Sequence, residues 1–242
     1  MKRAFPILAV LTVVFVAYGF YLGLFVAPTE RTMGEVQRIF YFHAPSGWTA
    51  FWLFFVNLIA SVVYLIRRNL KADALAVAAA EVGVVFCTVV LVTGPLWARP
   101  VWGIWWTWDL RLTSTLVLWL IYVSYLMLRR FSGSAQTPVL AAVLAIFGAL
   151  DVPLVYFSIW FFRTQHPQPV IGNGGSLDPS MRPAFWTNVA AFSCYGALLC
   201  WARYRVELMH RNVEEAYALE SLLDEGSSSG ADTRPAYRGS PQ

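Results

Sequence analysis

Long apolar stretches separated by short polar connections dominate this chain. Crossing a bilayer takes about 20 mostly apolar residues in a helix. Six stretches approach or exceed that length, and only Glu81 in the third and Asp151 in the fifth interrupt them with a charge. The pattern therefore predicts an all-α integral membrane protein with six transmembrane helices. The expected spans are Ala4–Thr29, Gly47–Ile66, Ala74–Trp97, Thr113–Leu128, Pro138–Phe161 and Ala184–Ala202.

The pattern changes after the sixth stretch. Charged residues alternate with Leu, Met, Val and Tyr over residues 206–225, which is typical of a helix in water. Residues 226–242 are rich in Ser, Gly and Pro, a composition that favours disorder. We therefore expect a membrane domain at 1–205, a cytoplasmic helix at 206–225 and a disordered tail at 226–242.

Lysine and arginine near the ends of the spans predict the orientation, because cytoplasmic loops carry the excess of positive charge. Ten such residues lie on the side that holds both termini and six on the opposite side. Both termini are therefore expected in the cytoplasm. The outer side then carries the three longer connections, which are Pro28–Ser46, Ala98–Leu112 and Phe162–Pro183.

Composition supports a bilayer as the surroundings of the chain. Of 242 residues, 58% are hydrophobic and 13% charged, whereas soluble domains are near one half and one quarter. The net charge of +4 is small and scattered, which argues against a nucleic-acid partner.

Tryptophan is concentrated in one short stretch, at the end of the third span and in the outer connection after it, which holds five of the chain's 11. Trp often marks the membrane interface, and that reading accounts for one or two of them. Prolines and glycines among them predict a non-helical loop, and many indoles on such a loop form a flat apolar surface. Aromatic faces stack on extended π-systems, so the expected ligand is large and planar, such as a porphyrin. The tryptophans are Trp97, Trp102, Trp105, Trp106 and Trp108.

Two histidines lie on the same predicted side. Taken singly, His43 and His166 are more typical of hydrogen-bonded structural histidines than of metal ligands. Together they could fill both axial positions of a haem iron, and such a site would hold or pass on haem, with no vacancy for a substrate. Haem propionates would need arginine partners, and the sequence leaves four candidates open. These are Arg38, Arg99, Arg111 and Arg163.

Asp109 closes the Trp-rich segment. A carboxylate would repel a propionate, so we expect Asp109 to fix the loop through Arg111 or backbone N–H groups, or to contact a partner. A plain loop or helix-start role is an equally good interpretation of this residue.

The segment Trp102–Ser114 reads W-G-I-W-W-T-W-D-L-R-L-T-S. It resembles the Trp-rich "WWD" signature of the haem-handling membrane proteins of cytochrome c biogenesis, and among them most of all the heme exporter protein C (CcmC) family. The related haem lyases have a similar core but usually continue W-D-P and are commonly longer. The resemblance covers nearly the whole chain.

This resemblance implies a site and a role. His43 and His166 match the two axial ligands of a b-type haem. The signature positions, expected to take part in haem binding, are Trp102, Gly103, Trp105, Trp106, Trp108 and Asp109. Family members bind haem on the periplasmic side of the bacterial inner membrane and load it onto a haem chaperone, CcmE. They work beside the ABC-type CcmA/CcmB complex and the small subunit CcmD.

No P-loop pattern occurs in the sequence, so we expect a haem-binding and transfer protein that is not itself an enzyme. Two alternatives stay open at this point. One is a proton- or ion-coupled transporter that uses Glu81 and Asp151, because ionisable groups within membrane spans are often functional. The other is a related cytochrome c haem lyase.

Overall fold

The protein is described here from a computed structural model that covers residues 4–162, 164–167 and 177–231, with side chains as far as residue 223. No strand occurs in these ranges, and one isolated bridge joins Glu30 to Gly34. The predicted all-α class is therefore confirmed. The elements are α1 (Ala4–Tyr21) with a π-helical turn at Leu22–Val26, a 3-10 turn at Glu35–Ile39, α2 (Phe40–Arg67), α3 (Leu70–Trp102), α4 (Leu110–Phe131), α5 (Thr137–Phe161) and α6 (Arg182–Ala231).

Among the described residues, five helical segments are long and apolar enough to cross a membrane. They are Ala4–Val26, Glu35–Arg67, Leu70–Trp102, Leu110–Phe131 and Thr137–Phe161. The first part of α6 is not among them, because Thr187, Asn188 and Ser193 interrupt its apolar residues. The sixth span at Ala184–Ala202 and the cytoplasmic location of both termini stay predictions.

Several boundaries differ from the expected ones, and two of them involve prolines. The second span was expected to begin at Gly47, but α2 begins at Phe40 and contains Pro45. Pro95 and Pro100 were expected to break the Trp-rich segment, but α3 continues through both as far as Trp102. A proline inside a helix removes one backbone hydrogen bond, which neighbouring helices can compensate in a packed membrane bundle. The non-helical part is therefore only residues 103–109.

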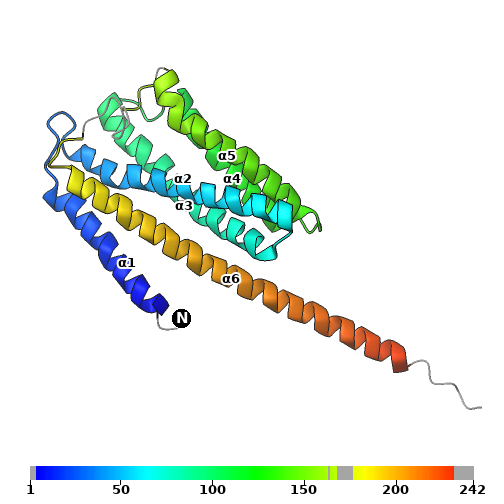
Figure 1. Ribbon diagram of the computed structural model, residues 1–242. Helices are drawn as coiled ribbons and strands as arrows, with labels where there is room; N and C mark the ends of the chain where they lie inside the picture. Colours follow the sequence, from blue (N-terminus) through cyan, green and yellow to red (C-terminus); the bar gives the residue numbers. More distant parts are fainter. Residues whose placement is uncertain (1–3, 163, 168–176, 232–242) are drawn as a thin grey trace, which may run out of the picture. The chain divides into compact units, whose positions relative to one another are not determined.

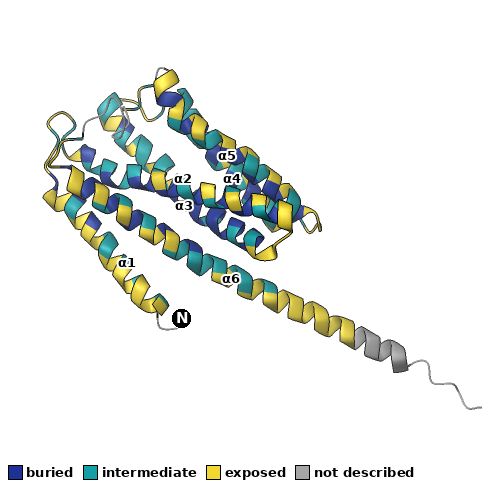
Figure 2. Cartoon of the chain, in the orientation of Figure 1, coloured by how far each residue is buried: buried dark blue, intermediate teal, exposed yellow. Residues whose placement is uncertain are grey.

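Two helix pairs form the centre of the fold. Helix α2 packs along α3, α4 packs along α5, and further contacts join α2 to α5 and α3 to α4. Figure 1 shows α4 and α5 on one side of the α2–α3 pair, with α1 and the first part of α6 on the other. Most residues of α1 are exposed (Figure 2), as expected for a helix whose surroundings are lipid.

The chain divides into two compact units, Met1–Tyr204 and Arg205–Gln242, with α6 passing from one into the other. Helix α6 is described as far as Ala231. Residues 206–225 are therefore helical, and the helix includes residues 226–231, where the disordered tail was expected to begin. Residues 232–242 lie outside the described residues. The domain division, the disorder of the tail and the cytoplasmic location of the helix stay predictions.

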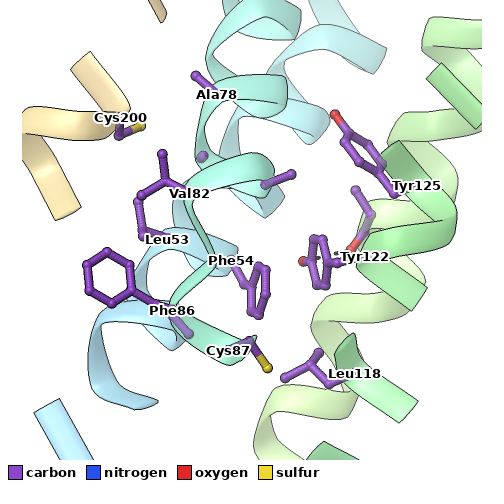
Figure 3. Packing of buried hydrophobic residues seen from close by; sticks show 14 of the residues in the cluster. Leu53, Phe54, Ala78, Val82, Phe86, Cys87, Leu118, Tyr122, Tyr125 and Cys200 are labelled. Carbon is purple, nitrogen blue, oxygen red and sulfur yellow. Dashed lines mark hydrogen bonds between the residues drawn. The ribbon is translucent and has the colours of Figure 1, made fainter. Parts of the chain in front are cut away.

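Aromatic rings and small residues make the core between α2, α3 and α4 (Figure 3). The ring of Phe54 on α2 stacks on that of Tyr122 on α4, with 3.8 Å between centroids and 11° between planes. Gly83 of α3 lies directly beside Phe54, since a Cβ at this position would come within 2.6 Å of Phe54 Cε1. The absence of a side chain at Gly83 thus lets the Phe54–Tyr122 stack reach α3.

Ion pairs join the helices at the end where the connections are short. Arg129 of α4 donates two hydrogen bonds, of 2.8 and 2.6 Å, to the buried carboxylate of Asp73 on α3. Arg203 of α6 pairs with Glu81 of α3, with 2.9 Å between Nη2 and Oε1. Glu81 therefore joins two helices through its ion pair with Arg203.

Candidate functional site

The three longest connections lie at one end of the bundle formed by α1–α5, because successive helices run in alternate directions (Figure 1). They join α1 to α2, α3 to α4, and α5 to α6. We call this end the loop end. It carries both predicted ligand histidines and the Trp-rich segment, so the structure gathers in one place what the sequence spreads over three connections.

The two histidine rings are neighbours. His43 lies near the start of α2 and His166 follows α5, and their ring centroids are 6.4 Å apart with planes inclined by 32°. Both residues are half-buried. A metal–imidazole nitrogen bond is about 2 Å long, and each ring adds about 1 Å to its centre, so one metal between two imidazoles needs roughly 6 Å between centroids. The observed separation suits that requirement.

Hydrogen bonds on Nδ1 determine which nitrogen of each ring is available. His43 Nδ1 is 2.9 Å from Thr93 Oγ1, whose hydroxyl donates to the Val89 carbonyl at 2.6 Å, so the hydroxyl accepts from His43. His166 Nδ1 is 2.9 Å from the Pro167 carbonyl, which can only accept. Nδ1 carries the proton in both rings, and the Nε2 lone pairs are available for a metal. Neither Nε2 has a hydrogen-bond partner within the ranges that the structure describes.

The electrostatic surroundings keep the imidazole of His166 neutral. Burial, and next the positive charge of Arg111, lower the pKa of His166 from 6.5 to about 3. Arg111 lies in the first turn of α4, and its Nη1 donates to the Val155 and Tyr156 carbonyls of α5 at 3.3 and 3.5 Å. A neutral imidazole is the form that binds a metal.

The loop at residues 103–109, here called the Trp loop, presents two indoles to the surroundings. Trp105 is 57% and Trp108 76% exposed. Trp106 is half-buried and packs edge-on against Trp108, with 5.9 Å between centroids. Gly103 ends α3 with φ of +78°, a left-handed conformation that glycine adopts without strain. Trp102 is still helical and packs at 5.1 Å against Trp97. The exposed indoles of the Trp loop, which we call the ledge, are therefore those of Trp105 and Trp108.

Asp109 connects the Trp loop to the His166 segment. Its Oδ1 accepts from Leu112 N–H at 2.9 Å and caps the start of α4, as expected for a residue that fixes the loop through a backbone N–H. Its Oδ2 accepts from the Thr164 hydroxyl at 2.8 Å and from the Thr107 hydroxyl at 3.2 Å. Thr164 Oγ1 in turn accepts from His166 N–H at 3.1 Å.

The four candidate arginines differ in their surroundings. Arg38 donates from Nη1 to the Gly23 and Ala27 carbonyls at 3.0 and 2.9 Å, so it fixes the end of the first helix. Arg99 donates to the Gly103 carbonyl and secures the beginning of the Trp loop. Arg163 lies outside the described residues. Arg111 is the candidate whose charge acts on His166.

Sequence reasoning missed Thr93 and Thr164. Thr164 stands two residues before His166, and a hydroxyl at that distance often bonds to the local backbone. Thr93 and His43 lie on different helices, and nothing in the sequence around either residue predicts their contact. Both residues act through a histidine rather than at the ledge.

The donor set fits a porphyrin better than a bare metal ion. No group of three or more His, Cys, Asp or Glu that could hold a metal occurs among the described residues. Two imidazoles supply only an axial pair, so the other ligands must come with the metal, as the four porphyrin nitrogens do in haem. The exposed indoles at the same end of the bundle offer an aromatic surface for such a ring.

An all-helical fold with five membrane-length helices among the described residues and two adjacent imidazoles at the loop end is that of a multi-pass membrane protein with a candidate ligand site at one end of its bundle. The comparison of sequences specifies the family. The model of the family described as heme exporter protein C (CcmC) matches residues 1–219, so this chain belongs to the heme exporter protein C family. The resemblance inferred from the Trp-rich segment is thus confirmed.

Curated relatives match over most of their length. The heme exporter protein C of Bradyrhizobium diazoefficiens is 36% identical over 236 residues, which cover 96% of this chain and 89% of the relative. That of Escherichia coli K12 is 31% identical over 227 residues, covering 91% and 90%. That of Rhodobacter capsulatus is 31% identical over 219 residues, covering 88% and 89%.

Proposed function

We propose that this chain binds haem between His43 and His166 at the periplasmic face of the bacterial inner membrane and delivers it to the haem chaperone CcmE for cytochrome c maturation. Membership of the heme exporter protein C family supports haem handling in cytochrome c biogenesis. The membrane-length helices support a multi-pass membrane location. We further propose the axial pair, the periplasmic side and the recipient from the geometry of the site and from the family resemblance.

The observation that carries the proposal is the pairing of two half-buried imidazoles with 6.4 Å between centroids, each with its Nδ1 engaged. This arrangement fixes the tautomer of both rings, so that each Nε2 offers its lone pair to a metal. A b-type haem, bound without covalent attachment, would bring iron whose two axial positions these nitrogens fill. With both positions occupied by protein, the site has no vacancy for a substrate, so it suits holding and transfer.

The Trp loop supports a second part of the proposal. Trp105 and Trp108 present exposed indoles at the same end of the bundle as the histidine pair, and such indoles can stack on a porphyrin or meet an arriving chaperone. Arg111 is the arginine we assign to a haem propionate, because the charge of its guanidinium acts on His166 and, among the described residues, its hydrogen bonds engage only Nη1. A guanidinium can pair with a carboxylate through the others.

Transfer requires that one axial bond be given up. Ligation must therefore be strong enough to orient haem and reversible when the recipient arrives. The family resemblance gives the partners as CcmE, the ABC-type CcmA/CcmB complex and the small subunit CcmD, with any ATP hydrolysis belonging to another chain.

The test combines binding and delivery. The full chain in mild detergent is titrated with hemin, and the loaded protein is mixed with purified chaperone. His43→Ala and His166→Ala should each weaken hemin binding and impair loading of the chaperone. His210→Ala is the matched control, because His210 is exposed and its contact with a carboxylate is to Glu214 of its own helix, at 3.6 Å. Unimpaired loading by both site variants would reject the two histidines as ligands.

A further inference from the structure

The two proposed ligands are held in different ways. His43 belongs to a 28-residue helix, and its Nδ1 bonds to Thr93 on a second long helix. Both partners lie on regular elements with extensive mutual packing. His166 follows the end of α5, outside any helix, and its Nδ1 bonds to the carbonyl of the next residue. The hydrogen bond to Pro167 therefore fixes the tautomer of His166, but it does not fix the position of the ring relative to His43.

The position of the His166 segment depends on Asp109. The Thr164 hydroxyl donates to Asp109 Oδ2 at 2.8 Å, and the same oxygen of Thr164 accepts the backbone N–H of His166 at 3.1 Å. A longer contact of 3.4 Å joins Gln165 N–H to Asp109 Oδ2. Asp109 itself is anchored, because its Oδ1 caps the first turn of α4 through Leu112. Thr164 thus links a fixed carboxylate to the backbone of a ligand residue.

Resting on the proposed function, we propose that Asp109 is a positioning residue, which holds His166 beside His43 through Thr164, and that His166 is consequently the ligand released first. The Asp109–Thr164 contact is one side-chain hydrogen bond, and Asp109 directly follows Trp108 in the Trp loop, whose indoles at Trp105 and Trp108 are exposed. A recipient that docks on these indoles can displace the contact without disturbing α2 or α3. His43 keeps its Thr93 partner throughout.

The chain offers a closely matched set of variants. Thr164→Val removes the hydroxyl that joins Asp109 to His166, and Thr164→Ser keeps it. Thr107→Val removes the other hydroxyl on the same carboxylate oxygen, a 3.2 Å bond made from within the Trp loop. Asp109→Asn keeps an oxygen for the cap of α4 but replaces the acceptor that faces Thr164.

The experiment uses the full-length chain in detergent, loaded with hemin and followed by absorption and electron paramagnetic resonance. We expect six-coordinate low-spin iron in the wild type, Thr164→Ser and Thr107→Val. Thr164→Val and Asp109→Asn should raise the five-coordinate fraction roughly tenfold, since a hydrogen bond to a charged group is lost. Added imidazole should restore the low-spin spectrum in these two variants, as it should in His166→Ala.

Double variants show whether Thr164 acts through His166. In a His166→Ala background, Thr164→Val should have no further effect on hemin affinity. In a His43→Ala background, it should weaken the remaining binding by roughly the same tenfold factor. Equal effects in both backgrounds would indicate a general structural role and overturn the inference.

The experiment distinguishes failure of the proposed function from failure of the positioning role of Asp109 and Thr164. A wild-type chain that binds no hemin would reject the proposed function itself. A wild type with the six-coordinate spectrum and a Thr164→Val variant that matches Thr164→Ser would leave that function in place and reject Asp109 and Thr164 as the device that positions His166. Thermal melting of each variant without hemin verifies that a spectral change reflects the site.

Discussion

Thr93 provides a sharp test of how His43 is oriented. The substitution Thr93→Val keeps the shape of the side chain and removes its hydroxyl. In the wild type, His43 Nδ1 is 2.9 Å from this hydroxyl, which donates onward to Val89 at 2.6 Å. The variant therefore leaves the Nδ1 proton of a half-buried imidazole without its acceptor.

The size of the effect follows from that loss. A buried donor left without a partner costs about 1–3 kcal/mol, and each 1.4 kcal/mol is a factor of about ten in affinity. Partners of metal-bound histidines typically change affinity by about 10–100-fold when removed. We therefore expect Thr93→Val to weaken hemin binding by about 10–100-fold, and Thr93→Ser to bind as the wild type does.

The assay is a hemin titration of the full chain in detergent, followed at the haem absorption band. Thr88→Val is the matched control. The Thr88 hydroxyl also donates to the carbonyl four residues earlier, Val84 at 2.8 Å, but it receives the Trp119 indole N–H at 2.8 Å and no histidine. If Thr93→Val binds hemin as tightly as Thr88→Val, the assignment of Thr93 as the partner that fixes His43 is wrong.

Three further predictions concern stability and pH. Arg129→Met leaves the Asp73 carboxylate buried without its partner, so the free energy of unfolding should fall by about 3–5 kcal/mol, seen as a lower Tm in detergent. Gly83→Ala places a methyl 2.6 Å from Phe54 Cε1 and should cost about 1–3 kcal/mol in the same assay. His166 has a folded pKa of about 3 against about 6.5 in the unfolded chain. Its contribution is complete above pH 6.5 and is lost as the pH falls towards 3, because only the unfolded chain takes up the proton. Between pH 7 and pH 5 the wild type without haem should therefore lose up to about 2 kcal/mol of stability, and solvent screening at the half-exposed ring reduces this figure. His166→Asn lacks the titrating group and should not show this loss.

Each of these has a control within the chain. Arg130→Met removes an exposed neighbouring arginine and should leave the Tm unchanged, and an equal loss in both arginine variants would contradict the ion-pair argument. Gly133→Ala adds a methyl with no atom within 4 Å and should be neutral, unlike Gly83→Ala. A stability difference between wild type and His166→Asn that stays constant from pH 7 to pH 5 would refute the neutral state of His166.

The sequence predicted the helical layout where apolar runs had clear ends. The fifth span was expected at Pro138–Phe161, and α5 is Thr137–Phe161. Prediction failed at internal prolines: α2 begins before Pro45 and α3 continues through Pro95 and Pro100, because tertiary context can override the local preference of proline and sequence alone does not reveal that context. The sixth span stays a prediction, because the polar residues of α6 weaken its apolar pattern.

The site was predictable in its chemistry but not in its supports. His43 and His166 could be placed together because each lies near the same end of a predicted span, and the structure brings their rings to 6.4 Å. Thr93 could not be found, because its contact with His43 depends on the relative rotation of α2 and α3. Asp109 was recognisable as a loop-fixing residue, yet its bond to Thr164 depends on how two loops meet.

The most direct test of the central claim is the electron paramagnetic resonance spectrum of the full chain loaded with hemin, compared with the two single-histidine variants. Two axial imidazoles predict low-spin ferric iron in the wild type and high-spin iron in both His43→Ala and His166→Ala. Each variant should return to low spin when imidazole is added. Low-spin iron that persists in either variant without imidazole, or a wild type that takes up no hemin, would contradict the claim that these two rings share one iron.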